Sequence, residues 1–222
     1  MSRSMFWQIV RRDLRFSWML VVSGLVLGIA GFAFGPHGTL GASLSLILLV
    51  TAGLAPGIFM CSLLIWSERK DKSRLFALSL PISPARYALA KGLAASIGYL
   101  GSWGALAAAA LAGYTLFSVP TGSAPFLTVL WLFLLDLFCF LLSITLVSDS
   151  DGWFTAAIVL INTSIAPFIV LMTNIPSIGG HMNDLSALWS PAVFLTIAIE
   201  IAAAAAFIAV TVYRISRTRD FI

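Results

Sequence analysis

Two long stretches of this sequence, Phe16 to Ser67 and Gly92 to Leu135, contain no Asp, Glu, Lys or Arg. Over the whole chain, 60% of the residues are hydrophobic and 10% are charged. Soluble domains carry about 25% charged residues, so the chain is not an ordinary soluble domain. An apolar run of about 20 helical residues crosses a hydrocarbon core of roughly 30 Å. The sequence therefore predicts an integral membrane protein.

Six apolar runs are long enough to span a bilayer, and clusters of Gly, Pro and polar residues separate them. Lipid offers the backbone no hydrogen bonds, so each run must be helical unless the chain forms a closed barrel. A barrel would show alternating segments of about ten residues, which the sequence lacks. We therefore predict an all-α integral membrane protein whose single transmembrane domain occupies residues 1–222. Its six transmembrane helices are expected at about 17–34, 44–66, 86–117, 126–147, 153–173 and 189–213.

The thirteen Lys and Arg residues fall before the first run, between the second and third, and after the sixth. Cytoplasmic loops are enriched in these residues. This distribution predicts that both termini are cytoplasmic and that the protein is a multi-pass protein of the cell (inner, cytoplasmic) membrane. The net charge of +4 then reflects topology and attraction to anionic lipid. We expect membrane lipid, and no nucleic acid, among its partners.

The first basic group lies in Met5 to Phe16, MFWQIVRRDLRF. At 100° per residue, Arg11, Arg12 and Arg15 share one face of a helix and the large apolar residues share the other. Asp13 is the exception, because it falls on the apolar face. The pattern predicts a separate amphipathic helix that lies flat in the cytoplasmic leaflet.

A dense group of charges follows the second run, where six of the seven residues from Glu68 to Arg74 are charged. Glu68 and Lys72 are spaced i,i+4, and Asp71 and Arg74 are spaced i,i+3, which favours a short helix. Pro81 would end that helix, and Ser83 with Pro84 would start the next. The segment is therefore either a solvated turn required by topology or a docking helix for a cytoplasmic partner.

The order Glu68-Arg69, Lys72-Ser73, LSLPIS, Arg86 and Lys91 resembles the membrane subunits of the ABC type-2 exporter permease family. The resemblance implies that Glu68 to Leu80 is a coupling helix on which a separate cytoplasmic ABC ATPase subunit docks. It also implies export, and a homodimer or a heterodimer with a similar permease. The ATPase-coupling residues would be Glu68, Arg69, Lys70, Asp71, Lys72, Arg74, Leu75 and Phe76.

The sequence contains no G-x-x-x-x-G-K-[ST], and none of its three lysines follows a Gly. ATP and Mg are therefore expected on the partner ATPase, with no cofactor in this chain. Neither His lies in a predicted span, so no base is available for intramembrane hydrolysis. We predict a transport subunit that is not itself an enzyme and has no catalytic or metal site.

Two acids, Asp136 and Glu200, lie near the middle of predicted spans. A charge at that depth costs roughly 2.5–3.5 kcal/mol on insertion scales, so intramembrane acids are functional candidates. They are either protonated groups that hold the bundle together or part of a translocation path, which we predict to include Asp136, Ser143, Asn162 and Glu200.

Two alternatives stay open. A secondary transporter would use Asp136 or Glu200 as a proton relay. The opening MFWQIVRRDLR also resembles the haem-exporter B subunit of cytochrome c maturation.

Overall fold

The structure is a computed structural model that describes residues 2–34, 38–70, 84–116, 121–148, 150–182 and 184–217. Within these ranges all regular structure is helical, and six helical segments are long and apolar enough to cross a membrane. The predicted all-helical, six-span class is therefore confirmed. The elements are α1 (Ser2–Phe34), α2 (Gly38–Met60), η1 (Cys61–Trp66), α3 (Ser67–Lys70), α5 (Pro84–Leu116), η2 (Thr121–Ser123), α6 (Ala124–Val147), α7 (Asp151–Asn174), α8 (Pro176–Gly179) and α9 (Pro191–Arg217).

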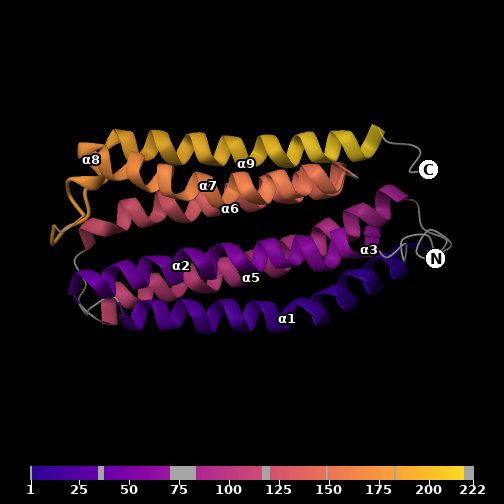
Figure 1. Ribbon diagram of the computed structural model, residues 1–222, viewed down its shortest axis with the longest axis horizontal. Helices are drawn as coiled ribbons and strands as arrows, with labels where there is room; N and C mark the ends of the chain where they lie inside the picture. Colours follow the sequence, from indigo (N-terminus) through magenta and orange to yellow (C-terminus); the bar gives the residue numbers. More distant parts are fainter. Residues whose placement is uncertain are drawn as a thin grey trace.

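The long helices run side by side in two layers (Figure 1). One layer holds α1, α2 and α5, and the other holds α6, α7 and α9. The chain termini, α3 and the start of α5 lie together at one end of the bundle (Figure 1). We call this the basic end, because the start of α1, the start of α5 and the end of α9 carry Arg12, Lys91 and Arg214 there.

The centre of the bundle is formed by α2 and α6. In the most apolar 18-residue stretch of each span, 56% of the second span (α2 with η1) and 50% of α6 is buried. The corresponding shares are 17% for α7 and 11% for α9. The exposed side chains of α7 and α9 include many large apolar ones, such as Leu160, Val170 and Ile199. Such a surface would be unfavourable in water and is typical of helices that face lipid or another membrane helix.

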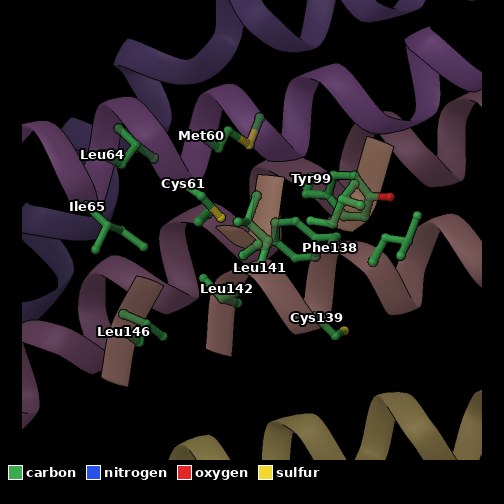
Figure 2. Close-up of a cluster of buried hydrophobic side chains, with 14 of the residues drawn as sticks. Met60, Cys61, Leu64, Ile65, Tyr99, Phe138, Cys139, Leu141, Leu142 and Leu146 are labelled. Atoms are coloured by element: carbon green, nitrogen blue, oxygen red, sulfur yellow. The ribbon is translucent and has the colours of Figure 1, made fainter. Parts of the chain in front are cut away.

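The largest apolar cluster lies where η1, α5 and α6 meet (Figure 2). At its centre the rings of Tyr99 and Phe138 are stacked at 3.9 Å, and the Tyr99 hydroxyl donates to the carbonyl of Leu134 at 3.1 Å. Gly57 of α2 lies directly against this ring pair. A Cβ at Gly57 would be 2.8 Å from Phe138 and 3.0 Å from Tyr99. The absence of a side chain at Gly57 thus permits close packing of α2 on α5 and α6.

Gly57→Ala is expected to lower the free energy of unfolding by about 1–3 kcal/mol, because the added methyl overpacks the stacked rings. Gly101→Ala is the matched control, since a Cβ at Gly101 of α5 would meet nothing within 4 Å. That control should leave the stability unchanged or raise it by up to about 1 kcal/mol, because Ala favours a helix over Gly. Thermal unfolding in detergent, followed by tryptophan fluorescence, measures both. Equal midpoints for the two variants would contradict the expectation.

The structure differs from the sequence prediction at the N-terminus. The segment Met5 to Phe16 does not form a separate interfacial helix, because α1 runs without a break from Ser2 to Phe34. The side chains of Ile9, Val10 and Asp13 are buried against the bundle. The apolar face that the pattern assigned to lipid packs instead on Ala90 and Ala94 of α5.

Candidate functional site

Four charged side chains and one hydroxyl meet at the basic end. Arg12 and Asp13 come from α1, Glu68 from α3, and Tyr87 and Lys91 from α5. These five residues are called the charge cluster below. Because its members belong to three separate helices, the cluster joins the start of the first span, the end of the second and the start of the third.

Lys91 lies at the centre of the charge cluster. Its Nζ is 2.7 Å from Asp13 Oδ2 and 2.7 Å from Glu68 Oε1. The contact with Glu68 is also a hydrogen bond, whereas Asp13 Oδ2 makes no hydrogen bond and is held by the ion pair. Arg12 lies 3.0 Å from Asp13 Oδ1 and 3.1 Å from Glu68 Oε1. The hydroxyl of Tyr87 donates to Glu68 Oε2.

Burial divides the charge cluster into an inner and an outer part. Lys91 is 2% exposed and Asp13 is 3% exposed, whereas the side chain of Arg12 is 62% exposed. Two cations and two carboxylates give no net formal charge, which lowers the cost of burying them. Removing one inner partner would leave a buried charge without compensation.

Local sequence explains why α1 brings Asp13 inward. Ile9, Val10 and Asp13 lie on one helical face, and that face packs on the small side chains of Ala90 and Ala94. Small residues let two helices approach closely in a membrane. Lys91 follows Ala90 directly and therefore meets the carboxylate of Asp13 at this crossing.

Glu68 follows a break in the regular geometry of the second span. Pro56 lies inside α2, and the next turns form the π-helix η1. A π-helical turn holds an extra residue and shifts the face on which all later residues lie, and such turns are frequent at functional sites. In this register Glu68 points toward α1 and α5.

η1 is also connected to the other layer of the bundle. The indole of Trp66 donates to Asp151 Oδ1 of α7 at 3.1 Å and stacks on Phe154 at 5.1 Å. The end of the second span is thus linked to α1, α5 and α7. A displacement of α3 would therefore act on helices of both layers.

The structure places only part of the predicted coupling segment. Glu68, Arg69 and Lys70 lie on α3, which continues from η1 without an interruption. Glu68 pairs with Arg12 of α1 and Lys91 of α5. Lys72 lies outside the described residues, as do four other predicted coupling residues: Asp71, Arg74, Leu75 and Phe76.

Three of the four predicted path residues lie between α6 and α9. Asp136 is 8% exposed and Glu200 is 5% exposed. Ser143 donates to the carbonyl of Phe207 at 3.2 Å and accepts a 2.7 Å hydrogen bond from Thr211. Asn162 is separate from them, because it is exposed on α7 and donates to its own helix at Ile158.

Two cavities flank this part of α6. One of about 240 Å³ lies toward the basic end and is lined by α5, α6 and α9, including Ser96, Cys139 and Thr211. The other, of about 260 Å³, is lined almost entirely by apolar groups of α1, α2, α5 and α6, including Trp103 and Trp131. Asp136 lies on α6 between the two sets of lining residues.

Sequence reasoning did not assign a site role to Asp13, Tyr87 or Thr211. Asp13 carried a usable signal, because an acid on an otherwise apolar helical face needs a buried cation. Lys91 contributes to the predicted topology and to the family resemblance, whereas Tyr87 and Thr211 have no distinguishing pattern in the sequence.

Comparisons with protein-family models, with curated proteins and with solved structures give no match for this chain. The fold alone supports a multi-pass membrane protein with six spans.

Proposed function

We propose that the chain is the membrane-embedded permease subunit of an ATP-driven exporter, powered by a separate cytoplasmic ABC ATPase. The observation that supports this most directly is the charge cluster. It connects α3, which begins the charge-rich stretch from Glu68 to Arg74, with the starts of α1 and α5. A partner that moves this segment would act through Glu68 on two further spans at once. A partner on one side of the membrane can move the bundle only if its contact is connected to several spans in this way.

The coupling segment and the path have different places in this proposal. The segment from Glu68 to Leu80 contacts the ATPase, and two copies of the permease, or one copy and a similar subunit, form the full exporter. ATP and Mg belong to the partner chain. Asp136, Glu200 and Ser143 line the route of the substrate, whereas Asn162 faces outward on α7, where another copy or lipid would contact it.

Co-expression with a candidate ABC ATPase subunit from the same organism tests the proposal. We expect the two proteins to co-purify in detergent and in nanodiscs, and the ATPase activity to change on association. The matched control keeps the composition and length of residues 71–80 but scrambles their order, which should abolish association without affecting the bundle. Absence of association in both media, or equal association of the scrambled variant, would contradict the proposal.

A secondary transporter is the second candidate, and the buried acids Asp136 and Glu200 favour it. Such a protein would transport in proteoliposomes in response to a proton gradient, without any ATPase. The permease proposal expects no transport under those conditions. Proteoliposomes that contain only this chain therefore separate the two candidates.

A further inference from the structure

Asp136 and Glu200 lie at the same level of the α6–α9 interface. The two helices run in the same direction, toward the basic end (Figure 1). Ser143 of α6 is level with Phe207 of α9, because its hydroxyl donates to the Phe207 carbonyl. Asp136 precedes Ser143 by seven residues and Glu200 precedes Phe207 by seven, which is about two helical turns in each case. This register brings the Asp136 and Glu200 carboxyl groups close enough to interact electrostatically.

The Glu200 carboxyl group has no partner in the described part of the chain. Both Oε1 and Oε2 are buried and neither makes a hydrogen bond. The sequence also offers no nearby cation, since Gly92 to Tyr213 contains no Lys or Arg. A buried carboxylate without a counter-charge is costly, so such a group either holds a proton or binds a cation. The pair is therefore a place where one positive charge can be accommodated.

Two separate cavities lie along α6, one on each side of the level of Asp136. Cys139 lines the cavity toward the basic end and lies about one turn from Asp136 on α6. Leu132 lines the apolar cavity on the other side, also about one turn from Asp136. Leu132, Asp136 and Cys139 share one face of α6 by their spacing. Mainly apolar space thus lies about one helical turn from Asp136 in each direction along α6, although neither acid lines either of these two cavities itself.

We propose that Asp136 and Glu200 bind the positive charge of the transported substrate, and that the substrate is an amphipathic organic cation whose apolar body lies in the adjacent cavities. When no substrate is bound, the carboxyl groups hold a proton, which leaves to water as the cation enters. That the bound cation is also transported rests on the proposed exporter function. The binding step does not, because it requires only this chain.

Equilibrium binding to the full chain in nanodiscs tests the proposal with two probes of similar shape. Methyltriphenylphosphonium is a lipophilic cation, and triphenylphosphine oxide is a neutral analogue. Binding to empty nanodiscs of the same lipid is subtracted. We expect saturable binding of the cation at least tenfold tighter than of the neutral analogue, because only the cation compensates the carboxylate charge.

Asp136→Asn and Glu200→Gln should each weaken binding of the cation at least tenfold and leave binding of the neutral analogue unchanged. Asp136→Glu, which keeps the charge, should retain cation binding. Asp184→Asn is the matched control, because Asp184 is an exposed acid outside the spans that pairs with His181. Its affinity for the cation should equal that of the unaltered chain.

Three results would overturn the proposal: no saturable binding of the cation, equal affinity for both probes, or unchanged cation affinity in both neutralised variants. Gel filtration and thermal unfolding show whether each variant is folded, and Asp136→Glu provides a folded test if the amide variants aggregate. Failure here leaves the ATPase association intact, whereas failure of the exporter function leaves cation binding intact. The two outcomes are therefore distinguishable.

Discussion

Lys91→Met is expected to destabilise the folded protein by about 3–5 kcal/mol, the usual cost of removing one partner of a buried ion pair. Lys91 is 2% exposed, and its ammonium group lies 2.7 Å from carboxylate oxygens of both Asp13 and Glu68. Met has a similar length but no charge, so the variant keeps most of the packing. The variant loses the positive charge that neutralises the carboxylates of Asp13 and Glu68. Arg12 is exposed and cannot neutralise both carboxylates alone.

Two double variants separate the partners of Lys91. Lys91→Met with Asp13→Asn leaves the Arg12–Glu68 pair and should recover most of the lost stability. Lys91→Met with Glu68→Gln should recover less, because it leaves the Asp13 carboxylate, whose side chain is 4% exposed against 27% for Glu68. Arg15→Met is the control: Arg15 is exposed on α1, so its replacement should change stability by no more than about 0.5 kcal/mol.

Chemical unfolding in detergent, followed by tryptophan fluorescence, gives these differences. Wild-type stability in Lys91→Met would contradict a structural role for the charge cluster. Equal recovery by both double variants would contradict the inner position of Asp13.

The six spans were predictable because hydropathy over a window of about 20 residues does not depend on how the helices pack. Each predicted span overlaps one long helical segment of the structure, although α9 begins two residues later than predicted. The charge cluster could not be predicted in the same way. Its formation depends on the rotation of three helices about their axes, and η1 changes the rotation of α3 relative to α2. Helical periodicity read from the sequence assumes a regular helix and misses this shift.

Prediction from the sequence is limited in the same way for the path residues in the membrane interior. Asp136 and Ser143 share a helical face by spacing, and the structure places both against α9. The prediction for Asn162 rests only on its depth in the membrane, which does not specify a helical face. In the structure Asn162 lies on the exposed face of α7, and its side-chain amide donates a hydrogen bond to the carbonyl of Ile158.

Glu68→Gln is expected to uncouple the proposed exporter: the associated ATPase should continue to hydrolyse ATP, while the membrane bundle should lose most of its response to nucleotide. Glu68 contacts Arg12 of α1 and Lys91 of α5, so it passes a displacement of α3 to two spans. The amide keeps the size of the side chain and can still accept from Tyr87, but it has no charge to hold the two cations. Charge reversal to Lys would be less informative, because three cations would then meet and destabilise the junction.

The response can be measured without knowing the substrate. Spin labels at Leu40→Cys and Leu185→Cys report on the end of the bundle opposite the basic end, where these side chains are 80% and 89% exposed. The native Cys61 and Cys139 are buried. In the unaltered complex we expect the distance between the labels to change when ATP is added, and in Glu68→Gln we expect that change to fall by more than half.

Asp184→Asn is the control for Glu68→Gln, since it makes the same acid-to-amide change outside the charge cluster and should leave the response to ATP intact. An unaltered distance change in Glu68→Gln would show that force reaches α1 and α5 by another route. Trp66 would then be the next residue to test, because its contacts with Asp151 and Phe154 connect η1 to α7 independently of any charge in the cluster.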